Sequence, residues 1–394
     1  MTPPPLPTRR YDIDTLRIIA FGLLIFYHIG MFYVTWGWHV KSVHASDFAE
    51  PAMRLLNPWR LSLLFLISGV ALRFLMDKSD NLWRLGGQRS WRLFLPIVFG
   101  MCVVVAPQSW LQLVESGEIS MGFYSFYPGY IMEDYSISTP TWNHLWYLVY
   151  LFVYTLILLP LARLLSRFAK AIEPGLAKLL SGRLGWAVLL LILFIPHMIF
   201  RLTLDARFPT THDLTSDWAN HAHSFTWLLS GFILAKSAAV WDAIRRGRWA
   251  LLAVTLVLAV ILTLIWNNWD VVAEDGTWLW PARVGRVAYY TVMILTLLAW
   301  AQRLASREWR GLRYLSEAVF PYYILHQTII VMAGFWLTRQ EISAPLEFGL
   351  LVLATCVVCA VGHEIIRRVS FLRPLFGLKP KPKVAPVASE PAVP

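Results

Sequence analysis

Long apolar blocks recur along almost the whole chain, and they limit its fold more than any other feature. A helix needs about 20 predominantly apolar residues to cross the roughly 30 Å hydrocarbon core of a bilayer. Ten blocks meet this length, centred on residues 14–36, 57–76, 91–112, 144–166, 184–203, 218–237, 248–267, 283–303, 318–338 and 346–368. Because a helix satisfies its own backbone hydrogen bonds in lipid, we predict an all-α, polytopic integral membrane protein with about ten transmembrane helices.

The composition agrees with lipid as the main solvent. Of the 394 residues, 57% are hydrophobic and only 15% are charged, and the mean hydropathy is +0.54. A single membrane domain over residues 1–373 is the simplest organisation. Residues 374–394 are rich in Pro, Lys and Ala, so we expect them to form a disordered cytosolic tail that buries no core.

The distribution of positive charge predicts the orientation. Lys and Arg concentrate in every second connection, beginning with Arg9 and Arg10, and the connections between these are poor in cations. The longest of the latter, residues 113–143, has no Lys or Arg and carries Glu115, Glu118, Glu133 and Asp134. Since Lys and Arg favour cytoplasmic loops, both termini are predicted to be cytoplasmic. The net charge of +11 is then a topology signal and does not indicate a nucleic-acid partner.

The first span carries ionisable residues, which are costly inside a membrane and usually functional. Asp14, Arg17 and His28 all lie in it. At about 100° and 1.5 Å per residue, Arg17 and His28 fall within about 20° of the same face and about 16 Å apart along the axis. We therefore expect the three side chains to face one polar groove, with Arg17 at its cytoplasmic mouth and His28 near mid-membrane. Either residue alone would more simply be a paired His or a snorkelling Arg.

The second span supplies a matching set. Arg60 lies near its outer end, Ser68 and Gly69 near its middle, and Arg73 about one turn further toward the cytosol. A Ser-Gly pair usually means close helix packing. Ser68 is a candidate for chemistry because it is predicted at a similar depth to His28.

Other polar residues lie at or within later spans. They are His144, Arg201, His221, His223, His326 and Glu364. A metal site at His221 and His223 is not expected, because two residues two apart on a helix point in different directions. The three cysteines lie in apolar blocks and imply neither a disulfide framework nor a zinc site.

These residues resemble the signature of the acyltransferase-3 superfamily. Arg17 followed by ten residues and His28, together with Leu66-Ile67-Ser68-Gly69, carries the resemblance. Supporting stretches are Trp38-His39-Val40-Lys41-Ser42, the run from Arg60 to Gly69, His144-Leu145-Trp146-Tyr147-Leu148, Tyr323-Ile324-Leu325-His326, and the region from Glu364 to Pro380. Within the superfamily the chain is most similar to enzymes that add succinyl groups to periplasmic glucans.

The resemblance implies a membrane O-acyltransferase of the bacterial inner membrane. It would move a succinyl or acetyl group from cytosolic acyl-CoA, a co-substrate, to a hydroxyl of a periplasmic glycan such as an osmoregulated glucan. No bound cofactor or metal is implied, and the partners are acyl-CoA, the glycan acceptor and membrane lipid.

Within that activity His28, Arg17 and Ser68 are the expected catalytic residues. His28 would act as the general base on the acceptor hydroxyl. Arg17, oriented by Asp14, and Arg73 would bind the CoA phosphates with loop cations such as Arg89 and Arg92.

Ser68 would either donate a hydrogen bond to the oxyanion or carry the acyl group covalently. Arg60 would bind the free carboxylate of a succinyl group. His144, Arg201, His326 and Glu364 are expected to bind donor or acceptor.

Two other classes of function compete. A transporter or flippase of a glycan or lipid-linked substrate would also carry mid-membrane charges, but it often shows the same broken helices in two halves, and here the charges concentrate in the first two spans. A membrane scaffold without chemistry would have no need for an Arg and a His on one face at different depths.

Overall fold

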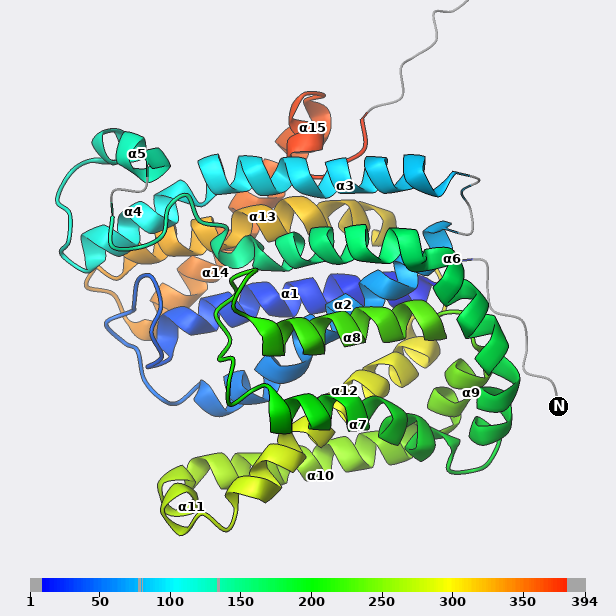
Figure 1. Cartoon of the computed structure of the whole chain (residues 1–394). Coiled ribbons are helices and arrows are strands. Elements are labelled where there is room, and N and C mark those ends of the chain that lie inside the picture. Colours follow the sequence, from blue (N-terminus) through cyan, green and yellow to red (C-terminus); the bar gives the residue numbers. More distant parts are fainter. Residues whose placement is uncertain (1–8, 77–78, 80, 133–134, 381–394) are drawn as a thin grey trace, which may run out of the picture.

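The computed structural model describes residues 9–76, 79, 81–132 and 135–380, and in that part of the chain every regular element is a helix (Figure 1). The helices are α1 (Tyr11–Tyr33), α2 (Glu50–Met76), α3 (Leu82–Phe99), the π-helical turn η1 (Gly100–Val104), α4 (Ala106–Glu115), α5 (Phe123–Met132), the 3₁₀ turn η2 (Asn143–Leu145), α6 (Trp146–Leu180), α7 (Gly185–Thr203), α8 (Trp218–Leu234), α9 (Ala238–Arg246), α10 (Arg248–Asn267), α11 (Trp269–Asp275), α12 (Leu279–Leu304), α13 (Leu312–Leu337), α14 (Ala344–Arg368) and α15 (Leu372–Leu375). The predicted all-α class is confirmed.

Nine helical segments of the described chain are long and apolar enough to cross a membrane. The segment Leu82–Glu115 passes from α3 through η1 into α4, and Asn143–Leu180 combines η2 with α6. The predicted span at 218–237 is different, because α8 ends at Leu234 and the chain bends by 107° into α9. Counting this bent pair as one span gives the expected ten. The cytoplasmic placement of both termini stays a prediction.

Helices α1, α2, α8, α12 and α13 form the centre of the bundle; in Figure 1 α1, α8 and α13 run across the view and α12 lies oblique to them. Helix α1 packs against α2, α12 and α13, and α2 packs against α8. In the most apolar window of α2, 67% of the residues are buried, against 17% for α10 and 22% for α14. The apolar faces of α10 and α14 are therefore left for lipid, and the polar residues of the central helices face protein.

Two glycines explain why α2 and α8 lie so close together. A Cβ atom on Gly69 would fall 1.9 Å from the carbonyl oxygen of Leu228, and one on Gly231 would fall 2.0 Å from the carbonyl oxygen of Leu66. The two backbones thus touch at reciprocal positions, as small residues permit between membrane helices. Gly69 of the Leu66-Ile67-Ser68-Gly69 motif therefore serves packing.

The two ends of the bundle differ in charge. We call the end where α1 and α13 begin and where α2 and α14 finish the basic end; it carries Arg9, Arg10, Arg313, Arg367 and Arg373. The opposite end carries the loop with α5 and the connections α1–α2 and α7–α8. Glu115 and Glu118 of the predicted acidic loop lie at this opposite end, and Glu133 and Asp134 lie outside the described residues.

The start of the predicted tail is folded onto the bundle. Phe376 and Leu378, just after α15, are buried in the main apolar core, and Arg92 of α3 donates a hydrogen bond to the carbonyl oxygen of Gly377. Residues 381–394 of the predicted tail lie outside the described residues, so their disorder stays a prediction.

Candidate functional site

A cavity of about 710 Å³ opens among α1, α2, η2, α6, α12 and the α7–α8 connection. Its wall combines aromatic rings with ionisable and amide side chains, among them Tyr27, His28, His39, Arg60, Asn143, His144, Trp146, Tyr147, Arg201, Asp205, His223, Arg286, Tyr290 and Gln327. Most of these residues lie near the end of α1 or α7, or near the start of α2, α6, α8 or α12. The cavity therefore occupies the half of the bundle away from the basic end, which is the predicted external half.

A histidine pair adjoins this cavity, and His28 is the member that lines it. The Nδ1 atom of His28 lies 2.7 Å from the Nε2 atom of His326, and the Nδ1 atom of His326 lies 2.7 Å from the carbonyl oxygen of Tyr323. A carbonyl only accepts, so the Nδ1 of a neutral His326 carries the proton and its Nε2 accepts. His28 then donates through Nδ1, and its Nε2 keeps a free lone pair. His28, which lines the cavity, thus has the tautomer of a base.

His144 of η2 forms hydrogen bonds with α13, the helix that carries His326. Its Nε2 donates to the carbonyl oxygen of Ile324 at 3.1 Å, and its backbone carbonyl accepts from the hydroxyl of Tyr323. Its ring also lies edge-on to His326, with centroids 5.3 Å apart. The His144 and His326 motifs, 182 positions apart in the sequence by their numbers, therefore meet at one point beside His28.

An amide cluster forms the adjoining wall, and no sequence prediction included it. The side-chain amide nitrogen of Gln327 lies 3.1 Å from Nε2 of His39, from Oδ1 of Asn143 and from Oε1 of Gln108. Nδ1 of His39 donates to Oε1 of Gln112 at 2.5 Å. Burial lowers the pKa of His39, so its ring stays neutral and Nε2 can accept. Gln108 and Gln327 inside apolar blocks were the signal, because an unpaired amide in lipid is costly.

A further part of the wall is cationic. Arg60 from α2, Arg201 from α7 and Arg286 from α12 line it, and Arg201 forms an ion pair with Asp205 at 2.6 Å. Asp205 also accepts from Nε2 of His223 at 3.1 Å. Burial alone raises the pKa of Asp205, but the hydrogen bonds from His223 and Arg201 outweigh it and hold the pKa below its ordinary value. The carboxylate is therefore ionised.

Ser68 lies one hydrogen bond behind the cavity wall. Its hydroxyl is 2.8 Å from the hydroxyl of Tyr147, which lines the cavity. Tyr147 also interacts electrostatically with Arg17 and Arg89. This tyrosine therefore stands between the cavity and the cations of the basic half.

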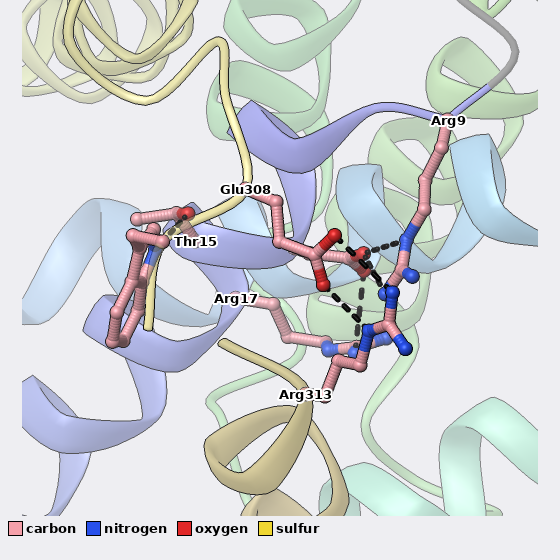
Figure 2. A network of polar contacts seen from close by, with 7 residues as sticks. Arg9, Thr15, Arg17, Glu308 and Arg313 are labelled. Carbon is pink, nitrogen blue, oxygen red and sulfur yellow. Dashed lines mark hydrogen bonds and ion pairs between the residues drawn. The ribbon is translucent and has the colours of Figure 1, made fainter. Parts of the chain in front are cut away.

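Arg17 and Asp14 lie at the basic end and do not line the cavity. Asp14 is 3.4 Å from Arg17 and 3.3 Å from Arg9. Figure 2 shows Arg9, Arg17 and Arg313 gathered between the starts of α1 and α13, with Arg313 paired to Glu308 at 2.6 Å. The predicted Asp14 contact with Arg17 is present, and Arg17 also interacts electrostatically with Arg89 and Arg92 of α3.

Arg73 and Glu364 are also outside the cavity wall. Arg73 is buried, with its guanidinium 5.4 Å from the ring centre of Phe232. Glu364 accepts from the hydroxyl of Tyr314 at 2.9 Å and pairs with Arg367 and Arg368. The structure thus gives these two residues local packing and ion-pair partners rather than a place beside His28.

His221 and His223 point to different partners, as their spacing predicts. His221 bonds with the hydroxyl of Tyr154 at 2.8 Å, and His223 bonds with Asp205. Within the described chain no group of three or more His, Cys, Asp or Glu side chains is placed to hold a metal ion.

A family model described as an acyltransferase domain, of the acyltransferase-3 type, matches residues 10–364. The chain belongs to this acyltransferase family. The match runs from the start of α1 to the last turns of α14, so it includes the cavity, the histidine pair, and Arg10 and Arg313 of the basic end. The resemblance of Arg17, His28 and the Leu66-Ile67-Ser68-Gly69 motif to the acyltransferase-3 family is thereby confirmed.

This acyltransferase chain aligns with its relatives over almost the full length of both chains. The glucans biosynthesis protein C chains of Escherichia coli strain K12, of strain O81 ED1a and of strain O9:H4 HS are each 23% identical to it over 390 residues. The alignment covers 95% of this chain and 96% of each relative. No solved structure matches the chain. The protein is thus a multi-pass membrane acyltransferase.

The site can perform base-assisted transfer to a hydroxyl group. His28 supplies an acceptor nitrogen in a cavity large enough for a small-molecule or sugar substrate. The aromatic rings of the wall offer stacking surfaces, and the arginines and amides offer hydrogen bonds.

Proposed function

We propose that this acyltransferase moves a succinyl or acetyl group from acyl-CoA to a hydroxyl of a periplasmic glycan, such as an osmoregulated glucan, in the bacterial inner membrane. The observation that carries the proposal is the His28–His326 contact of 2.7 Å, which leaves Nε2 of His28 free as a base in the cavity wall. The name of the relatives, glucans biosynthesis protein C, supports a glucan as acceptor.

The chemistry follows from that base. Nε2 of His28 accepts the proton of the acceptor hydroxyl while its oxygen attacks the thioester carbonyl carbon and forms the new C–O bond. The C–S bond then breaks, and the departing CoA thiolate takes a proton from the His28 imidazolium. The products are the glycan ester and free CoA, and the histidine returns to its neutral state.

The donor reaches this base from the basic end. Arg17, Arg89 and Arg92 interact electrostatically with one another, and these neighbouring cations favour the phosphate groups of CoA. The thioester then extends toward Tyr147, which separates this cluster from the cavity. In this proposal Tyr147, which lines the cavity, donates to the developing oxyanion, and Ser68 behind it donates to Tyr147. In the described part of the chain the side-chain hydrogen-bond partner of Ser68 is Tyr147 and not a base, which favours hydrogen-bond donation over a covalent acyl-serine.

The proposal is tested by mass spectrometry of envelope glycans. Cells lacking the gene are complemented with the natural chain, with His28→Ala, or with His44→Ala, whose exposed side chain lies away from the cavity. Acylated glycan is expected with the natural chain and His44→Ala but not with His28→Ala at equal membrane abundance. Acylation that persists in His28→Ala contradicts the assignment of the base.

The transporter alternative makes a different prediction. A flippase would move its substrate without consuming acyl-CoA, so membranes containing it would release no free CoA in a His28-dependent way. The acyltransferase is expected to release CoA only when donor and acceptor are both present and His28 is intact.

A further inference from the structure

The cationic wall of the cavity has more positive than negative charge. Arg60, Arg201 and Arg286 contribute three guanidinium groups, and Asp205 is the one carboxylate among the described residues that line the cavity. Asp205 already bonds with Arg201 and His223. Two guanidinium groups of this wall therefore remain without a carboxylate of their own.

Arg60 shows the imbalance most clearly. Only 5% of its surface is exposed, and its Nε and Nη1 atoms have no hydrogen-bond partner among the described residues. Its guanidinium lies 3.2 Å from the ring centre of Tyr27, a contact that stabilises the charge. A buried guanidinium with free donors is expensive unless an anion completes its environment.

The neighbouring arginines repeat this pattern. Nε of Arg201 is buried without a hydrogen-bond partner among the described residues. Asp205 is the acidic group that acts on Arg286, and it acts on Arg201 at the same time. Guanidinium groups present several N–H donors in a fixed plane, which matches the oxygens of a carboxylate or phosphate.

We propose that Arg60, Arg201 and Arg286 form a binding site for an organic anion, a carboxylate or phosphate group of the substrate that occupies the cavity. This inference rests on the proposed function and narrows its substrate to an acidic one. Arg60 acts electrostatically on His28, so the anion binds beside the base and orients the reacting group toward it.

Either of the two substrates could carry the anionic group. The acyl group carries the anion if the donor is the thioester of a dicarboxylic acid. The acceptor carries it if the glycan bears an acidic substituent. In either case a neutral acyl group on a neutral acceptor leaves two of the three arginines without an anionic partner.

The site is tested first by binding. Thermal unfolding of the purified full-length protein in detergent is followed with increasing succinate or inorganic phosphate, and with succinamide as a neutral control. Either anion is expected to raise the unfolding midpoint, and succinamide is not. Arg286→Gln is expected to raise the anion concentration needed for half of the stabilisation at least about tenfold, because it removes a charged donor. Arg283→Gln, one turn earlier on α12, exposed and outside the cavity wall, is the matched control and retains the full response.

Arg60→Gln is compared in the same way, and Arg286→Gln keeps the test decisive if Arg60→Gln does not fold. Equal anion responses in the natural chain and Arg286→Gln overturn the proposal. A response to succinamide as large as that to succinate also overturns it, because the site would then not select charge.

Transfer assays then distinguish the two sources. A loss in Arg286→Gln that is larger with a dicarboxylic acyl donor than with an acetyl donor assigns the anion to the acyl group. A loss that is larger with an acidic glycan than with a neutral one assigns it to the acceptor. Equal losses for both acyl donors, each tested with both glycans, overturn a substrate-binding role. If anions bind as expected but no donor is turned over, the proposed function fails while the anion site stands.

Discussion

The Nδ1 atom of His28 lies 2.7 Å from the Nε2 atom of His326, although the two residues are 298 positions apart in the sequence. His326 is itself held by the carbonyl oxygen of Tyr323, at 2.7 Å from its Nδ1. A backbone carbonyl therefore sets the tautomer of His28 through a second imidazole, where a carboxylate often does so in other enzymes. The pair is uncharged when its base is ready to act, which suits a site inside a membrane.

Replacing His326 tests this relay. His326→Ala removes the acceptor for the Nδ1 proton of His28, and an unsatisfied buried donor costs about 1–3 kcal/mol. At about 1.4 kcal/mol per factor of ten, kcat is expected to fall roughly 5- to 150-fold with little change in KM for the donor. His326→Gln, whose amide oxygen can accept, should lose less. Equal kcat values for the natural chain and His326→Ala would show that His326 does not orient the base.

Replacing Ser68 separates its two possible roles. Ser68→Ala removes the hydrogen bond to Tyr147, which contributes about 0.5–1.5 kcal/mol, so activity is expected to fall roughly 2- to 13-fold. Tyr147→Phe removes the same bond from its other side and should cause a similar loss. The double variant should then lose less than the product of the two single losses. A fall to background in Ser68→Ala, with an acyl adduct on the natural chain by intact-mass measurement, would contradict the hydrogen-bond role.

Much of the fold could be predicted from the sequence, because apolar length and charge placement are local properties. The exception is the bend between α8 and α9. A hydropathy window cannot detect that Ser237 caps a new helix by accepting from the backbone N–H of Val240. The amphipathic α9 that follows carries Trp241 on its buried face and Arg245 on its exposed side.

The site could be predicted only in part. Helical periodicity gave the face of His28, and depth suggested Arg60, His144 and Arg201, all of which line one cavity. Periodicity does not say which helix a face meets, so the contact with His326 was not foreseen.

Other members of the site were missed because they depend on tertiary structure. Asp205 lies just after the end of α7, four residues beyond Arg201, and its role appears only when α8 brings His223 to within 3.1 Å of it. Arg286 lies within the predicted span 283–303 but was not among the predicted site residues, although an arginine within an apolar helix is as costly as Arg60. Asp14, Arg17, Arg73 and Glu364 lie outside the cavity wall, and their functional roles stay predictions.

The glycine contact between α2 and α8 predicts a stability effect. In Gly69→Ala the new Cβ atom would lie 1.9 Å from the carbonyl oxygen of Leu228, so the helices must separate. Overpacking of this kind costs about 1–3 kcal/mol, and the thermal unfolding midpoint in detergent is expected to fall. Gly22→Ala on α1 is the matched control, because its Cβ would meet nothing within 4 Å. It should be neutral or stabilising by up to about 1 kcal/mol. The idea fails if both variants unfold at the same temperature.

The amide cluster predicts a pH dependence. Burial lowers the pKa of His39 below its ordinary value of 6.5, so the unfolded chain binds more protons at this residue when the pH falls below that value. The stabilising contribution of neutral His39 is therefore complete above about pH 6.5 and is lost as the pH falls. His39→Gln should show a smaller loss of unfolding temperature than the natural chain between about pH 7 and about pH 5. His44→Gln is the exposed control, and an identical pH dependence in His39→Gln and the natural chain would refute the assignment.

The role of His28 as the base is the central claim, and transfer by the purified protein in liposomes tests it most directly. The measurement follows labelled acyl groups moving from acyl-CoA to a glucan, with free CoA counted in parallel. General-base catalysis contributes about 10²- to 10⁴-fold, so His28→Ala is expected to lose at least about a hundredfold in both readouts while its unfolding temperature and donor binding stay unchanged. Transfer by His28→Ala within a few-fold of the natural chain would contradict the account.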